Sequence, residues 1–197
     1  MIVLVAALKG GVGKTTTAVY LATVAAAGRK PVTLVDADPQ ASAADWIDGA
    51  TDERLETIEI VEAPTDRLLA KTLGKMNGGV AVVDTPPGQE RLLTKAMEQA
   101  DVIVIPTRVG GVETARVHAV LDLVPRKVPA GLIISSARTY TRDYDDAVGE
   151  WEEAGVPVWA TVPERVAIAA GPTGWLAEDG LEAFRGAWRR IQRAVRG

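Results

Sequence analysis

The 197-residue sequence contains no cysteine and only one histidine. The absence of cysteine excludes disulfide bonds and thiolate metal sites, and His118 alone is too little for a zinc site. We therefore expect a cytoplasmic protein. The net charge is −4, so the field of the whole molecule gives no general attraction to nucleic acid. Any binding of DNA would need a local basic patch.

Long hydrophobic runs are also missing. Residues 1–8 are apolar, but they are too few to span a bilayer and lack the basic start of a signal peptide, so we predict a strand. No linker rich in glycine, serine or proline divides the chain, and no repeat is visible. We expect one domain over residues 1–197.

Short apolar runs alternate with segments of helical pattern. The runs show little polar alternation, as expected for strands that helices cover on both faces of a parallel sheet. They occupy residues 2–7, 32–35, 58–61, 80–83, 102–105, 132–134 and 156–160. Helices are predicted over residues 14–27, 66–76, 91–99, 112–124, 143–154 and 181–195. This order predicts an α/β fold with a doubly wound, mainly parallel sheet of about seven strands flanked by helices.

A glycine-rich loop follows the first predicted strand and opens a helix. Its sequence is Lys9-Gly10-Gly11-Val12-Gly13-Lys14-Thr15-Thr16. The glycines let backbone N–H groups approach phosphate oxygens, and the helix N-terminus adds to the attraction for an anion. Lys14 would lie near the β- and γ-phosphates, and the Thr15 hydroxyl would ligate Mg²⁺. The pattern therefore predicts a site for a nucleoside triphosphate.

Aspartates follow two other predicted strands. Asp36 and Asp38 come after the second strand, and Asp84 comes after the fourth. Parallel strands bring their carboxyl ends to the edge where open α/β sheets bind ligands. We expect Asp84 to hold Mg²⁺ through water and Asp38 to position the attacking water. Either one alone could instead be a turn or helix-capping residue.

The loop departs from the usual phosphate-binding pattern, because Leu8 replaces its first glycine and Lys9 follows. In this respect it resembles the deviant Walker A motif of the ParA/MinD family of P-loop ATPases. In that family a "signature" lysine, here Lys9, reaches the partner's nucleotide across a dimer interface. Residues 36–40 and 84–88 resemble the two switch segments of the family. No Asn/Thr-Lys-x-Asp tetrad for guanine is present, which favours ATP, with ADP as the product, over GTP.

The resemblance extends to residues 161–171. The corresponding segment of the family packs on adenine, so Pro163 and Arg165 are candidates for contact with the base. An ordinary strand-to-helix loop would look the same.

The sequence also resembles one group within the family. A first strand that begins at residue 2 leaves no room for an N-terminal helix-turn-helix, so we expect no operator binding. The segment 38–42, followed by Trp46, resembles the small plasmid-partition proteins typified by ParF. The resemblance implies a sandwich homodimer on Mg·ATP, nonspecific DNA binding or polymerisation, and association with the nucleoid. It also implies that a small centromere-binding adaptor similar to ParB or ParG stimulates hydrolysis.

The last predicted helix leaves several functions open. Apolar residues recur along it at spacings of three and four, and five arginines form a basic surface. The helix could pack its apolar stripe on the sheet, present arginines to DNA, or bind lipid as the C-terminal helix of MinD does. A metabolic P-loop enzyme similar to dethiobiotin synthetase is a further alternative, but no small-substrate motif supports it.

Overall fold

The computed structural model describes residues 1–169 and 176–197, and the structural statements below concern these residues. They form a seven-stranded parallel sheet with the strand order β3-β2-β4-β1-β5-β6-β7. The strands are β1 (Ile2–Val5), β2 (Val32–Asp36), β3 (Ile58–Glu62), β4 (Val80–Asp84), β5 (Val102–Thr107), β6 (Ala130–Ala137) and β7 (Val158–Pro163). The predicted doubly wound α/β fold is confirmed.

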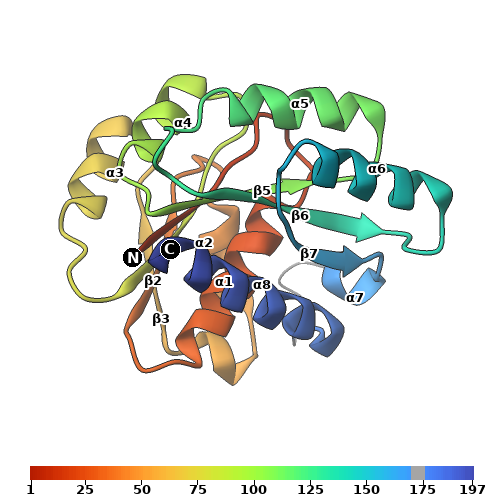
Figure 1. Ribbon diagram of the computed structural model, residues 1–197. Helices are drawn as coiled ribbons and strands as arrows, with labels where there is room; N and C mark the ends of the chain where they lie inside the picture. Colours follow the sequence, from red (N-terminus) through yellow and green to blue (C-terminus); the bar gives the residue numbers. More distant parts are fainter. Residues whose placement is uncertain (170–175) are drawn as a thin grey trace.

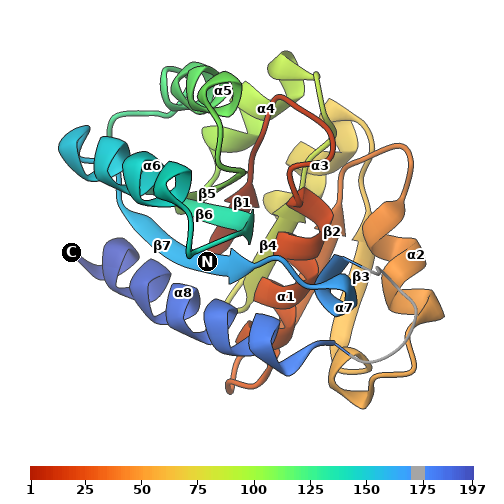
Figure 2. The ribbon, with the colours of Figure 1, turned by 90° about the vertical axis from the view of Figure 1, so that its right-hand side faces the viewer.

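Helices cover both faces of this sheet (Figures 1 and 2). One face carries α1 (Lys14–Ala26), α2 (Ser42–Gly49) and α8 (Glu178–Arg196). The other face carries α3 (Asp66–Leu73), α4 (Glu90–Met97), α5 (Gly111–Leu121) and α6 (Arg142–Glu153). The shorter elements are the 3-10 helix η1 (Glu53–Leu55) and α7 (Val166–Ala169).

Because helices cover both faces of the sheet, the strands are apolar along their length and do not alternate between apolar and polar residues. In β1, Val3 and Val5 belong to the hydrophobic core under α1 and α8, whereas Leu4 belongs to the core under α3 to α5. Successive side chains point to opposite faces of a strand, so each of them meets a helix layer. Polar groups are thereby confined to the strand ends, where the ligand site is expected.

Helix α8 is firmly packed on α1. The rings of Tyr20 and Phe184 stack with their centroids 5.1 Å apart. A Cβ atom added to Gly180 would lie 2.6 Å from the ring of Tyr20, so only glycine permits this approach. Four members of the predicted apolar stripe are buried, namely Leu181, Phe184, Trp188 and Ile191. Of the roles left open for this helix, packing of the stripe on the sheet is the one that these four residues show, whereas the fifth member, Val195, is exposed.

An ion pair between buried Asp52 and half-buried Arg54 fixes the start of α8. Asp52 Oδ2 accepts a hydrogen bond from the backbone N–H of Leu176 at 2.9 Å and another from the guanidinium of Arg54. Arg54 also donates to the carbonyl of Leu176 at 3.1 Å. The hydrogen bond from Arg54 lowers the pKa of Asp52 despite its burial. The Tyr20 hydroxyl accepts from Ala177 N–H at 3.0 Å, which ties the same turn to α1.

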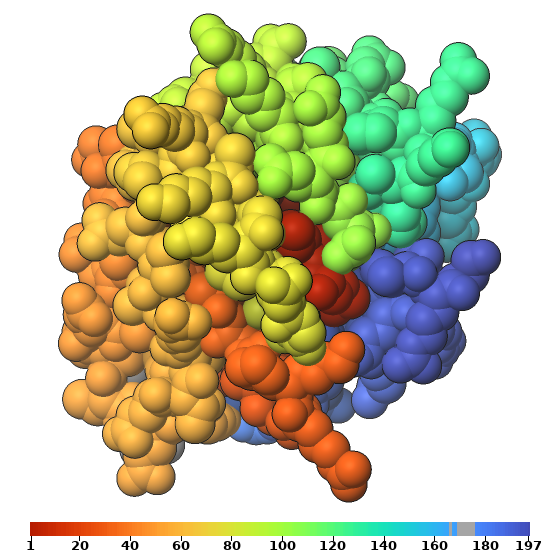
Figure 3. Space-filling view, turned by 90° about the vertical axis from the view of Figure 1, so that its left-hand side faces the viewer, coloured from red at the N-terminus to blue at the C-terminus, as the bar shows by residue number. Residues whose placement is uncertain are grey.

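Both termini lie on the side of the molecule opposite the carboxyl edge of the sheet (Figures 1 and 3). The Met1 ammonium donates to the carbonyl of Gly79 at 2.9 Å. In residues 1–169 and 176–197, no helix has both the length and the apolar character needed to cross a membrane.

Three elements were not predicted, namely α2, η1 and α7. Ala41, the residue directly before α2, has a φ of 51° and provides no side-chain cap. The helix is instead capped from a distance, because Asp36 accepts hydrogen bonds from the N–H groups of Ala43 and Ala44. Strand β7 begins at Val158 rather than at the predicted residue 156, since Pro157 precedes it in the turn from α6.

The contact between β6 and β7 generates a prediction for stability. A Cβ atom on Gly131 would lie 2.4 Å from the indole of Trp159. We expect Gly131→Ala to lower the free energy of unfolding by about 1–3 kcal/mol because of overpacking. The matched variant Gly149→Ala, in α6 with no atom within 4 Å of an added Cβ, should instead raise stability by about 0.5–1 kcal/mol. Urea denaturation measures both, and equal effects would contradict the packing at Gly131.

Candidate nucleotide-binding site

The glycine-rich loop joins β1 to α1 at the carboxyl edge of the sheet. Gly11 and Gly13 have φ values of +75° and +93°, which other residues rarely adopt. A Cβ on Gly13 would also lie 3.1 Å from the hydroxyl of Ser135 at the end of β6. The carbonyl of Leu8 accepts a hydrogen bond from Gly88 N–H at 3.1 Å, which fixes the loop to the segment after β4.

The first turn of α1 is open to an anion. Within the described residues, no side chain caps the helix, and no acidic residue lies in its first turn. The unpaired N–H groups and the helix dipole therefore favour a negative ligand at this end.

The Lys14 ammonium lies inside the loop. It donates to the carbonyl of Lys9 at 2.9 Å, and the residue is only 7% exposed. Burial lowers the pKa of Lys14, while the charges of Asp84 and Asp38 oppose that shift. A buried cation held by one carbonyl is well suited to exchange that contact for phosphate oxygens.

The half-buried Thr15 and the buried Asp84 form a hydrogen-bonded pair. The Thr15 hydroxyl donates to Asp84 Oδ2 at 2.7 Å. The other oxygen, Oδ1, is buried and has no hydrogen-bond partner among the described residues. Burial raises the pKa of Asp84 to about 7, and the nearby charges of Asp36 and Asp38 add to this, against the Thr15 hydrogen bond and the Lys14 charge. A carboxylate with such an unused oxygen fits a cation or a cation-bound water.

A Mg²⁺ ion at this pair would need further ligands. In residues 1–169 and 176–197, no group of three or more histidine or acidic side chains is arranged to hold a metal. Mg²⁺ commonly retains waters and binds one or two protein oxygens together with substrate phosphates. The Thr15 hydroxyl and the Asp84 carboxylate fit that mode of binding.

Asp36 organises the segment that carries Asp38. Its carboxylate is fully buried and accepts three backbone hydrogen bonds, from Asp38 N–H at 3.0 Å, Ala43 N–H at 2.8 Å and Ala44 N–H at 3.0 Å. Burial raises the pKa of Asp36, and these hydrogen bonds oppose the shift. The sequence analysis gave Asp36 no separate role. The sequence feature that could have indicated this role is the position of Asp36 at the end of a fully buried strand. A charged side chain at such a position must have strong partners.

Asp38 is half-buried and lies at the same edge. Its Oδ1 accepts from Gln40 N–H at 3.0 Å. Its charge opposes the lowering of the pKa of Lys14 and adds to the raising of the pKa of Asp84, so the three charged groups are near one another. The structure thus brings the loop, Asp38 and Asp84 together.

Lys9 is directed toward α5 and not into its own loop. Its ammonium lies 2.8 Å from Glu113 Oε1, and the side chain is 47% exposed. The same carboxylate oxygen accepts from the guanidinium of Arg116 at 2.7 Å. The hydrogen bond from Lys9 is the main reason that the pKa of Glu113 is lowered.

A cavity of about 210 Å³ adjoins the glycine loop. Pro163 and Arg165 line it, as do Gly11, Gly13 and Thr16 of the loop. Three polar residues that the sequence analysis missed also line it, namely Arg108, Ser135 and Ser136. The two serines follow the predicted strand 132–134 at the edge where ligands bind. That position is the sequence feature that could have marked them as site residues. The last two residues of the predicted adenine segment, 170 and 171, lie outside the described residues.

Known proteins share this sequence pattern. The model of the CobQ/CobB/MinD/ParA nucleotide binding domain matches residues 3–173. "Protein ParA" of Rhizobium radiobacter is 38% identical over 109 residues, which cover 54% of this chain and 48% of that protein. "Maintenance of carboxysome distribution protein A" of Gloeobacter kilaueensis is 39% identical over 149 residues, which cover 74% of this chain and 65% of that protein. The chain thus spans about half to two thirds of these relatives.

The fold is shared with solved structures. A plasmid partition protein from Borrelia burgdorferi bound to AMPPNP superposes with a TM-score of 0.78 over 98% of both chains, at 22% identity. Together with the match over residues 3–173, the glycine loop and the aspartates at the strand ends show that this chain belongs to the CobQ/CobB/MinD/ParA family of nucleotide-binding domains.

Proposed function

We propose that this chain is a DNA-segregation ATPase of the small plasmid-partition group that ParF typifies. In this proposal Mg·ATP drives formation of a sandwich homodimer that binds DNA without sequence preference or polymerises. A small centromere-binding adaptor then stimulates hydrolysis to ADP. The position of Lys9 carries the proposal, because an exposed second lysine beside the loop can reach a partner's nucleotide. The relatives named ParA and the plasmid partition protein support the choice of function.

Each residue of the site has a role in the proposed reaction. The loop N–H groups and Lys14 bind the β- and γ-phosphates, and Thr15 and Asp84 hold Mg²⁺, which neutralises developing phosphate charge when bound. Asp38 orients the attacking water, and Asp36 fixes the backbone of Asp38 through its three hydrogen bonds.

Lys9 can leave its present contact at low cost. Glu113 keeps Arg116 as a partner after Lys9 departs, so no carboxylate is left without a cation. The free ammonium can then approach the phosphates of a second subunit. Pro163 and Arg165 remain the candidates for contact with adenine.

A membrane function is disfavoured by the packing of α8. Lipid binding would require Phe184, Trp188 and Ile191 to insert, but all three are buried against the sheet and α1. Extracting them would expose core surface to water before lipid could cover it. The arginines on the outer side of the helix remain available for DNA.

Two lysine substitutions test the proposal. We expect Lys14→Ala to weaken ATP binding by about 10- to 100-fold, because it removes a charged hydrogen bond to phosphate. Lys9→Ala should bind ATP as a monomer but fail to dimerise. Nucleotide titration and sedimentation velocity measure the two effects, with Lys30→Ala, an exposed lysine, as the control. Unchanged ATP-dependent dimerisation in Lys9→Ala would refute the proposed role of Lys9.

The raised pKa of Asp84 predicts a pH dependence of stability. The ordinary value of 3.8 applies to the unfolded chain, whereas the folded carboxyl has a pKa of about 7. The folded state therefore retains a proton that the unfolded state releases, and stability should fall as pH rises between these values. Nucleotide-free Asp84→Asn should show a smaller decline and be more stable than the parent at about pH 8.

Thermal unfolding between about pH 4 and 8 measures this difference. Asp48→Asn, which changes an exposed carboxylate of α2, is the matched control and should follow the parent. Identical pH profiles for the parent and Asp84→Asn would show that Asp84 does not titrate in this range.

Substitution of arginines in α8 tests the proposed binding of DNA. Arg189 and Arg193 are exposed, whereas Arg190 donates to the carbonyls of Val158 and Trp159 at 2.9 Å and has a structural role. In ATP, Arg189→Ala combined with Arg193→Ala should weaken binding of a random duplex. The log–log salt slope should become shallower by about 0.9 for each DNA phosphate that the variant no longer neutralises.

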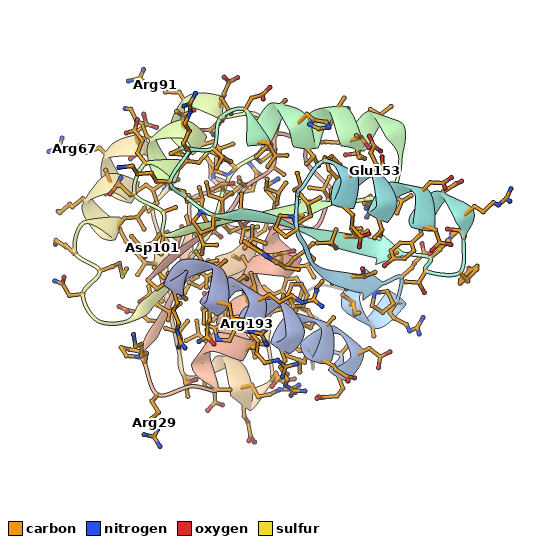
Figure 4. All side chains as sticks on the ribbon, viewed as in Figure 1. Arg29, Arg67, Arg91, Asp101, Glu153 and Arg193 are labelled. Carbon is orange, nitrogen blue, oxygen red and sulfur yellow. The ribbon has the colours of Figure 1, made fainter. Side chains whose placement is uncertain are left out.

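Fluorescence anisotropy over a series of salt concentrations gives both quantities. The control pair is Arg67→Ala with Arg91→Ala, which lie on α3 and α4, away from Arg193 (Figure 4). Equal affinity of the parent and the α8 variant would place any DNA contact elsewhere.

A further inference from the structure

A groove follows the free edge of the sheet, between α6 and α8. Strand β7 ends the strand order, and it lies between these two helices in Figure 2. The groove has a volume of about 620 Å³. Its lining includes Tyr144, Val148 and Glu152 of α6, Ala160 and Thr161 of β7, and Glu182 and Gly186 of α8. It shares only Pro163 with the cavity beside the glycine loop.

An edge strand is a template for another extended chain, since one side of its backbone has no neighbouring strand. Here the chain covers part of that edge itself. The Arg190 guanidinium donates to the carbonyls of Val158 and Trp159, each at 2.9 Å. The groove opens farther along β7, over Ala160 and Thr161. Val158 and Trp159 line the groove as well, so Arg190 covers one part of the edge inside the groove. Among the described residues, no side chain bonds to the backbone of Ala160 or Thr161, which form the uncovered part.

Gly186 lines the groove on the α8 side, and it has no side chain that would project into the groove. It lies in the interior of a 19-residue helix, where glycine is less favourable than alanine. No atom lies within 4 Å of a Cβ added there, so close packing does not require glycine. Its effect is to leave room for the side chains of an incoming chain.

Carboxylates stand on both sides of the groove. Glu152 on α6 and Glu182 on α8 are exposed, and neither forms an ion pair with any residue that the structure describes. Helix α6 as a whole contains six acidic residues and one arginine. Among the described residues that line the groove, Arg190 alone is basic, and it is engaged by the β7 carbonyls. The electrostatic complement of this groove is thus a basic chain.

The two carboxylates also define where the basic residues should be. Helices α6 and α8 cover opposite faces of the sheet, and successive side chains of an added strand point to opposite faces. One side chain would face Glu152, and the next would face Glu182. A matching segment therefore carries lysine or arginine at adjacent positions.

From these features we propose that the groove binds an extended, basic segment of a partner protein, which adds to β7 as an eighth strand of the sheet. The backbone at Ala160 and Thr161 pairs with the segment, Glu152 and Glu182 bind its adjacent cations, and Gly186 leaves room for the side chain that faces Glu182. This site does not depend on the proposed ATPase function, because the residues that would pair with the segment and bind its cations do not line the cavity beside the glycine loop, which meets the groove at Pro163.

The test uses the full chain and two labelled hexapeptides. One has the sequence Arg-Lys-Val-Arg-Lys-Val, and the other has glutamate at each basic position. Anisotropy at low salt should give an affinity for the basic peptide at least about tenfold higher than for the acidic one. The NMR signals of the Ala160 and Thr161 amides should shift when the basic peptide binds.

Substitutions then locate the binding. Gly186→Leu fills the groove and should weaken binding at least about tenfold. Gly149→Leu, in α6 but outside the groove lining, should bind as the parent does. Glu152→Gln combined with Glu182→Gln should weaken binding about five- to tenfold, and this difference should shrink at high salt.

Two outcomes would overturn the proposal. The first is equal affinity for the basic and the acidic peptide. The second is parent-like binding by folded Gly186→Leu, with folding checked by circular dichroism. If Gly186→Leu does not fold, the pair of glutamine substitutions decides, because surface carboxylates are not needed for the core. Loss of nucleotide binding in Lys14→Ala should leave peptide binding unchanged, which separates this proposal from the ATPase.

Discussion

Burial of both faces of a parallel sheet is the constraint on which the rest of the molecule depends. Each central strand meets a helix layer on either side, so no charged side chain can be placed along its length without a large desolvation cost. Charged groups are therefore concentrated where strands end, and Asp36 and Asp84 are the last residues of neighbouring strands in register. The fold thus produces a cluster of acidic groups beside a loop that attracts anions.

The acidic groups of this cluster repel one another when no ligand is bound. The charges of Asp36 and Asp38 both raise the pKa of Asp84, and a single buried lysine opposes them. A ligand that brings cations to this edge would relieve the repulsion, and its binding energy would add to the stability of the folded state. The raised pKa means that ionisation of Asp84 is less favourable in the folded chain than in the unfolded one.

The sequence predicted those features that depend on local pattern. The uninterrupted apolar runs identified the strands, and the glycines before Lys14 identified the phosphate loop, because both signals lie within a few consecutive residues. Helix α2 was missed because its cap, Asp36, lies six residues before its first residue. The contact of Lys9 with Glu113 joins residues 104 positions apart, and the bond of Arg190 to β7 spans 32. No local pattern encodes such pairs, so only the three-dimensional structure could show them.

The close approach of Tyr20 to Gly180 has a mechanical consequence. With no gap between α1 and α8, and with Ala177 bonded to the same tyrosine, the two helices cannot slide past each other without breaking packed contacts. The N-terminus of α1 forms part of the phosphate loop, and α8 carries the outer row of arginines. The packing therefore fixes the orientation of the α8 arginines relative to the helix that begins at the phosphate loop.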